Sequence, residues 1–149
     1  MGMIKTKREI ALIKKSAAIS NSCIPIIEKS LKENITEREL ARRIWRNIHK
    51  RGAGLAFRTL VACGKRSAMI HPKPTTTDKI ISGIGYVDFG ASYRGYKTDV
   101  TVPFIKGKIK SRERKIVKTV IQAYNIALKS WKIGMPCWKI HEKVDDYIK

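Results

Sequence analysis

Residues 86–101 read YVDFGASYRGYKTDVT, and this stretch decides the fold. Polar and apolar residues alternate on both sides of a turn-forming segment at residues 92–95. The pattern predicts two strands, 86–91 and 96–104, joined as an antiparallel hairpin. One side of this hairpin is apolar and is expected to face a core. Its members are Val87, Phe89, Ala91, Tyr96, Val100, Val102 and Phe104.

The other side of the hairpin carries two carboxylates, Asp88 and Asp99. If the chain turns about Tyr93 and Arg94, the two aspartates lie directly opposite each other. At about 5 Å their charges repel by roughly 3 kcal/mol, which a shared cation or proton relieves. Carboxylates that hold a pair of divalent metal ions are a usual way to activate water for hydrolysis.

Two alternatives to a metal site remain open for these aspartates. The hairpin can lie on the surface with both carboxylates solvated and Lys97 as a partner. Gly95 can also close a bulged loop, which shifts the pairing by one residue and separates the carboxylates.

Helices are predicted on both sides of the hairpin. From Thr6 to Leu31 apolar residues recur at helical spacing, with an interruption at Pro25. Thr36 and Glu39 form a capping-box pattern at the start of a second helix that ends near Arg51. Residues 55–63 predict a strand, and residues 116–134 and 138–148 predict two more helices. This order indicates an α+β fold, which we expect to be a single domain over residues 1–149. The apolar stripe of the first helical stretch is Ile10, Ile13, Ala17, Ile24, Ile27 and Leu31.

The composition limits the class of protein. Hydrophobic residues make up 43% of the 149, which excludes an intrinsically disordered chain. The three cysteines form no zinc-binding pattern and no disulfide framework, so we expect a reducing, cytoplasmic location. The sequence shows no stretch typical of a signal peptide or a membrane span, and no membrane partner is expected.

The order of motifs resembles the pita-bread metallopeptidases, a family that includes methionine aminopeptidase, Xaa-Pro aminopeptidase and Xaa-Pro dipeptidase. The resemblance covers nearly the whole chain, and the Asp-Phe-Gly-Ala and Gly-Tyr elements are more similar to the Xaa-Pro peptidases. It implies half of a pita-bread fold, with an antiparallel sheet and helices packed on one face. The matching segments are residues 4–14, 36–41, 55–64, His71 and residues 88–101.

The resemblance also implies roles for single residues. Asp88 and Asp99 match metal ligands of the family, and His71 matches a histidine that contacts the peptide substrate beside the metals. The implied cofactor is a pair of divalent ions such as manganese, cobalt or zinc.

The chain departs from the family pattern at two places. Residues 100–104 read VTVPF where the family usually has Ile-Thr-Arg-Thr-Phe, so an arginine is absent and Pro103 removes a backbone donor. The family's remaining metal ligands, a histidine in a His-x-x-Gly-His-Gly-like motif and two glutamates, have no match. His141 and Glu142 are adjacent on a predicted helix and diverge by about 100°, so they do not substitute. We therefore expect a metallopeptidase-type domain with an incomplete metal site that does not catalyse alone.

An isolated half of such a fold should expose apolar surface, which predicts a homo-oligomer or a second chain that supplies the missing half. The rival hypothesis is a non-enzymatic binding module for nucleic acid, ribosomes or proteins, derived from the same fold. A net charge of +20, with basic clusters at residues 42–46, 49–51, 65–66 and 106–118, favours phosphate binding. The alternative is that these charges form only a solvated surface.

Overall fold

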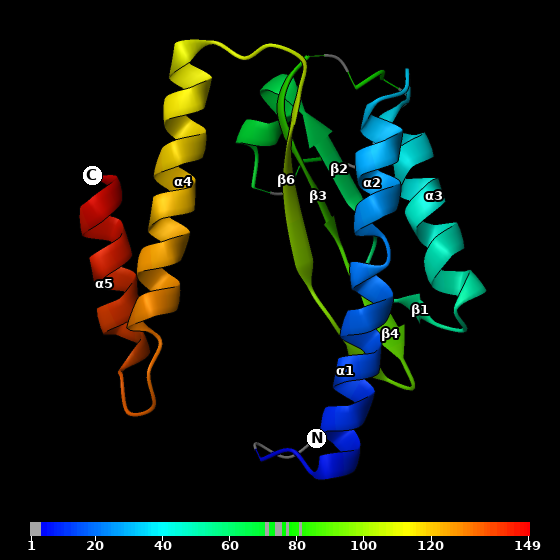
Figure 1. Ribbon diagram of the computed structural model, residues 1–149, viewed down its shortest axis with the longest axis vertical. Helices are drawn as coiled ribbons and strands as arrows, with labels where there is room; N and C mark the ends of the chain where they lie inside the picture. Colours follow the sequence, from blue (N-terminus) through cyan, green and yellow to red (C-terminus); the bar gives the residue numbers. More distant parts are fainter. Residues whose placement is uncertain (1–3, 71, 74–75, 77, 81) are drawn as a thin grey trace. The chain divides into compact units, whose positions relative to one another are not determined.

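The computed structural model describes residues 4–70, 72–73, 76, 78–80 and 82–149. The chain divides into two compact units, Met1–Lys108 and Ile109–Lys149, and each is described by itself. Figure 1 shows the elements of both units in chain order.

Three helices open the first unit: α1 (Lys7–Asn21), α2 (Ile24–Leu31) and α3 (Glu37–Lys50). The predicted interruption at Pro25 is confirmed, because the helical stretch breaks after Asn21 and Pro25 lies in the first turn of α2. A proline is tolerated there because the first turn of a helix has no backbone acceptor for its amide.

The predicted helix start at Thr36 is also confirmed. The Thr36 hydroxyl accepts from the Glu39 amide at 3.1 Å, which satisfies one of the unpaired donors of the first turn. The Glu39 carboxylate instead pairs with Arg43 at 3.2 Å. The reciprocal capping box is found at the start of α1, between Thr6 and Glu9.

The first unit contains two antiparallel three-stranded sheets. One has the order β2-β3-β6, with β2 (Leu60–Cys63), β3 (Gly83–Phe89) and β6 (Val100–Lys106). The other has the order β1-β4-β5, with β1 (Gly54–Leu55), β4 (Ala91–Tyr93) and β5 (Tyr96–Lys97). The strand predicted over residues 55–63 is therefore wrong as one continuous element, because the chain passes from one sheet to the other between Leu55 and Leu60. A short 3-10 helix, η1 (Gly64–Ala68), follows β2.

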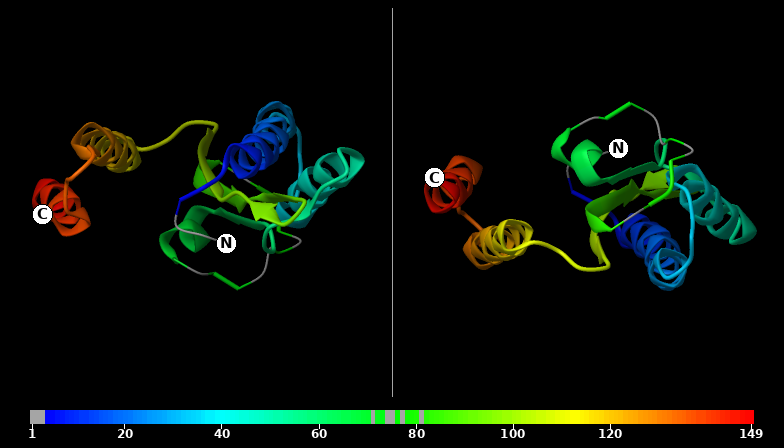
Figure 2. Two further views of the ribbon diagram at one scale, coloured as in Figure 1. Left: turned by 90° about the horizontal axis from the view of Figure 1, so that it is seen from below. Right: turned by 90° about the horizontal axis from the view of Figure 1, so that it is seen from above.

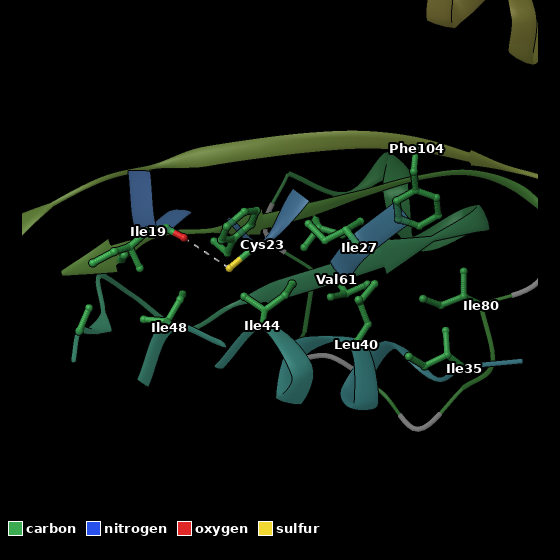
Figure 3. Close-up of a cluster of buried hydrophobic side chains, with 14 residues drawn as sticks. Ile19, Cys23, Ile27, Ile35, Leu40, Ile44, Ile48, Val61, Ile80 and Phe104 are labelled. Atoms are coloured by element: carbon green, nitrogen blue, oxygen red, sulfur yellow. Dashed lines mark hydrogen bonds between the residues drawn. The ribbon is translucent and has the colours of Figure 1, made fainter. Parts of the chain in front are cut away.

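Helices α1, α2 and α3 lie on one side of the sheets (Figure 2). Helix α3 contacts β2, α1 contacts β4 and β5 of the other sheet, and all three helices contribute side chains to one hydrophobic core. Leu40, Ile44 and Ile48 point from α3 toward Val61 and the side chains of the other helices (Figure 3). All four are fully buried, and each contributes roughly 1.5–3 kcal/mol by burial. This is the arrangement that the sequence predicted: an antiparallel sheet with helices on one face.

The buried face of α1 is rotated from the predicted stripe. Ile10 is 42% exposed, whereas Ser16 and Ser20 are completely buried beside Ile19. The apolar periodicity did not indicate these serines, because periodicity assigns buried positions to apolar residues.

The second unit consists of α4 (Ser111–Ser130) and α5 (Cys137–Ile148), which pack against each other. Both helices were predicted. An exposed apolar stripe follows α4 at every fourth residue, and only Ala123 of that helix is buried. The members of this stripe are Ile116, Val120, Tyr124 and Leu128.

The helical stretch Lys7–Leu31 is long and apolar enough, by length and composition alone, to cross a membrane. In the structure it is divided between α1 and α2, and one side of it contributes Ile19, Cys23 and Ile27 to the core of the first unit.

Candidate metal centre

Asp88 lies on the face of the β2-β3-β6 sheet that points away from the helical core. Its neighbours in β3, Val87 and Phe89, are fully buried, and successive strand residues point to opposite faces. Asp88 is paired with Thr101 of β6, whose hydroxyl donates to its Oδ1 at 3.3 Å. The strand therefore presents a half-buried carboxylate on the sheet face opposite the helical core.

The predicted register of the hairpin is wrong by two residues. Tyr93 pairs with Tyr96, so the turn lies at Arg94 and Gly95, with φ of 50° and 83°. Positive φ at both central residues is typical of the type I′ turn, whose twist matches that of the flanking strands. Asp88 is therefore opposite Thr101, not Asp99.

Because the shift is an even number of residues, it does not transfer either side chain to the other face of the sheet. Asp99 immediately precedes β6 and is exposed, whereas its neighbour Val100 packs against the core. The two aspartates are then diagonal rather than directly opposed, and diagonal neighbours lie roughly 7–8 Å apart. Such a separation weakens the repulsion between the two carboxylates.

A buried hydrogen-bond network fixes the chain just before Asp99. The Thr98 hydroxyl lies 2.7 Å from the hydroxyl of Ser20 on α1, and the Thr98 amide donates to the Ala91 carbonyl at 2.9 Å. The Ala91 amide donates to Ser20 at 3.0 Å, and Ser16 donates to the Ala91 carbonyl at 2.9 Å. Helix α1 thus anchors Ala91, at the start of β4, and Thr98, the residue before Asp99.

The backbone at Gly90, between β3 and β4, lies very close to the backbone at Thr98, between β5 and β6. A Cβ at that position would lie 1.9 Å from the Thr98 carbonyl oxygen, so only glycine fits there without a backbone shift. Packing therefore explains part of the Asp-Phe-Gly element. The phenylalanine fills the core, and the glycine allows the close approach to the Thr98 backbone.

Replacement of Ser20 by alanine is expected to destabilise the first unit by about 1–2 kcal/mol, because it removes a buried partner of Thr98 and of the Ala91 amide. Denaturant unfolding followed by circular dichroism measures the change. The matched control is Ser82→Ala at an exposed serine, which should stay within about 0.5 kcal/mol of wild type. Equal stability of Ser20→Ala and wild type would contradict the anchoring role.

Tyr86 precedes the site by two residues on the same strand face. Its hydroxyl donates to the Met69 carbonyl at 2.9 Å. Burial raises the pKa of Tyr86, and the negative charge of Asp88 raises it further, which indicates that the phenol and the carboxylate share one environment.

Glu37, at the start of α3, was not identified from the sequence as a site-supporting residue. Its side chain is buried, and its carboxylate accepts from the Cys63 amide at 3.1 Å and from both the amide and the hydroxyl of Thr76 at 3.1 and 3.0 Å. The Arg66 Nε lies 3.3 Å from the same carboxylate as an ion pair. One buried acid therefore connects the end of β2, η1 and the chain that leads to β3.

His71, the predicted substrate contact, falls within this connection but lies outside the described residues. His141 and Glu142 belong to α5 in the second unit, and neither was predicted to bind metal.

The donor chemistry of the two aspartates fits a divalent ion, because carboxylate oxygens are hard ligands that suit metals such as manganese. Within the described parts of the chain, however, no three His, Cys, Asp or Glu side chains come together as a metal-binding group.

Known proteins resemble this chain over nearly its whole length. Residues 11–149 match metallopeptidase family M24. An uncharacterised peptidase of Methanocaldococcus jannaschii is 38% identical over 99% of the chain, and the Xaa-Pro dipeptidase of Pyrococcus furiosus is 31% identical over 99%. The chain spans only 42% of the length of each.

Solved structures show the same relation. The prolidase from Pyrococcus furiosus superimposes with a TM-score of 0.91 at 30% identity, over 98% of this chain and 44% of its own. The X-Pro aminopeptidase from Thermotoga maritima gives 0.89 at 30% identity, over 98% and 42%. The fold described above is thus the α+β half of a pita-bread fold. With the family match extending over residues 11–149, the chain belongs to metallopeptidase family M24.

Proposed function

We propose that this chain is the part of an Xaa-Pro peptidase catalytic domain that supplies Asp88 and Asp99 to a dinuclear metal site, and that it does not hydrolyse peptides alone. The observation that supports it best is the position of Asp88 on the sheet face opposite the helical core, next to Thr101, in a chain that matches this family. The substrate class is taken from the Xaa-Pro dipeptidase and prolidase relatives.

The residues present support binding of a metal rather than turnover. Asp88 and Asp99 would hold divalent ions such as manganese, cobalt or zinc, and these ions, when bound, supply a Lewis acid and a water of lowered pKa. The resemblance places the remaining ligands in a histidine motif and two glutamates that the 149 residues do not contain. The proposed substrate contact of His71 depends on the motif match alone.

The exposed apolar stripe of α4 supports the requirement for a further polypeptide. Ile116, Val120, Tyr124 and Leu128 expose apolar side chains in a continuous row along one helix. Exposed rows of this kind mark surfaces that another chain or segment covers. We propose that the covering partner is a second-half polypeptide, or a second copy of this chain.

We also propose a cytoplasmic location. Cys23, Cys63 and Cys137 form no disulfide with one another, and such usage is typical of reducing compartments.

Calorimetric titration with Mn²⁺ tests the proposed half-site in the chain as it stands. We expect weak binding to wild type, and a loss of at least about tenfold in affinity for Asp99→Asn and for Asp88→Asn, equivalent to about 1.4 kcal/mol each. Asp146→Asn, an exposed acid of α5, is the matched control and should bind like wild type. Equal affinity in all four proteins would contradict the assignment of the two aspartates.

A further inference from the structure

The outer face of α3 carries a row of four cations that the peptidase function does not use. Arg38, Arg42, Arg46 and Lys50 occur at every fourth position and all are exposed. Residues four apart on a helix lie on the same face, and each step rises about 6 Å along the axis. The opposite face of α3 packs into the core through Leu40, Ile44 and Ile48 (Figure 3), so the row points to solvent.

Two aromatic side chains lie beside this row. Trp45 is 44% exposed, and its ring lies 4.3 Å from the ring of His49 at an interplanar angle of 35°. His49 is held in place because its Nδ1 donates to the Trp45 carbonyl at 3.0 Å when that nitrogen carries the proton. An exposed, positioned aromatic surface therefore lies next to regularly spaced positive charge.

No acid neutralises the row. Helix α3 has two acidic residues: Glu37 is buried and accepts from other groups, and Glu39 is paired with Arg43. In the part of the chain that the structure describes, the side chains of the four row residues have no hydrogen bond or ion pair with a protein group. The net charge of +20 adds a long-range attraction for anions.

We propose that this face of α3, the cation row with Trp45 and His49, binds single-stranded nucleic acid. The cations would follow successive phosphates, and the two rings would stack on bases, which is the combination used for single strands without sequence reading. An acidic polypeptide would match the positive charges, but its carboxylate side chains would not stack on the two rings. A membrane surface would need more apolar side chains than Trp45, which is the single exposed one on this helix.

Fluorescence anisotropy with a labelled oligouridylate tests the proposal in the full chain. Arg42→Glu with Arg46→Glu should weaken binding at least about tenfold. It should also lower the slope of log affinity against log salt by roughly 1.4, since each phosphate contact to a single strand contributes about 0.7. The matched control reverses two exposed lysines of α1, Lys14→Glu with Lys15→Glu, at the same change in net charge. Equal weakening by both pairs would overturn the proposal, because it would show diffuse attraction to the whole surface.

Trp45→Ala tests stacking separately from charge. It should weaken oligouridylate binding several-fold and leave binding of inorganic polyphosphate unchanged. Unchanged oligouridylate affinity would overturn the stacking role. If Trp45→Ala weakened binding of polyglutamate or of anionic lipid vesicles as much as binding of oligouridylate, the proposal would also be overturned, because the ligand would then be an acidic protein or a membrane.

Arg42→Gln with Arg46→Gln removes the two positive charges without introducing repulsion. This variant should also weaken oligouridylate binding, and thermal unfolding checks that each variant is folded.

Discussion

Replacing Glu37 with alanine is expected to lower the free energy of unfolding of the first unit by about 3 kcal/mol. The carboxylate accepts three hydrogen bonds, from the Cys63 amide and from the amide and hydroxyl of Thr76, and pairs with the partly buried Arg66. Removal takes the Glu37 carboxylate away from these donors and removes a negative charge from beside the Arg66 guanidinium. Loss of one partner from a buried ion pair typically costs about 3–5 kcal/mol.

Two variants separate this effect from the loss of any acid on α3. Glu37→Gln keeps one oxygen acceptor but places an amide donor against other donors, so an intermediate loss is expected. Glu39→Ala removes the neighbouring exposed acid, whose pair with Arg43 is worth no more than about 1 kcal/mol. Urea unfolding of the three variants measures the differences. If Glu37→Ala and Glu39→Ala lost the same stability, Glu37 would not be the connecting residue described here.

Local features of the fold were predictable from the sequence because they depend on neighbouring residues. The cap at Thr36, the break near Pro25 and the apolar face of the hairpin each follow from a few adjacent side chains. The family motif also indicated Asp88 and Asp99, and the structure keeps both residues on the side of the sheet opposite the helical core.

The register of the hairpin was not predictable with the same certainty. Two turn positions differ by one residue in the sequence, and each gives an alternating pattern with the same apolar face. The choice depends on the backbone conformation of Arg94, a non-glycine residue at positive φ, which residue type alone does not indicate. The predicted register therefore placed Asp99 opposite Asp88, where the structure has Thr101.

Ser20 and Glu37, which hold the segments around the aspartates in place, could not be identified from the sequence because their partners are distant in the chain. Ser20 bonds to Thr98 across 78 positions, and Glu37 bonds to Thr76 across 39. The available signal was weak: Ser16 and Ser20 are four apart within an apolar helix, where polar residues need a buried partner. For Glu37, in the first turn of α3, the sequence gave no such signal, because acidic residues are common at helix starts.

A hybrid peptidase provides the second prediction of large effect. This chain would replace the matched segment of the Pyrococcus furiosus Xaa-Pro dipeptidase, of which it covers 42%. In the hybrid, Asp88 and Asp99 come from this protein, and the remainder of the chain comes from the relative. On the proposed ligand role of the two aspartates, Asp88→Asn or Asp99→Asn in the hybrid should lower kcat/KM by at least about 100-fold, because loss of a metal ligand disturbs the whole site. Asp146→Asn should leave it within a few-fold of the parent hybrid.

The most direct test of the half-site account is therefore the rate of Xaa-Pro dipeptide hydrolysis in the presence of Mn²⁺, measured in parallel for this chain, the hybrid and its two aspartate variants. The account predicts no hydrolysis above background by the 149-residue chain, turnover by the hybrid, and loss of that turnover in both variants. Hydrolysis by the chain alone, or full activity of the hybrid without Asp88 or Asp99, would contradict it.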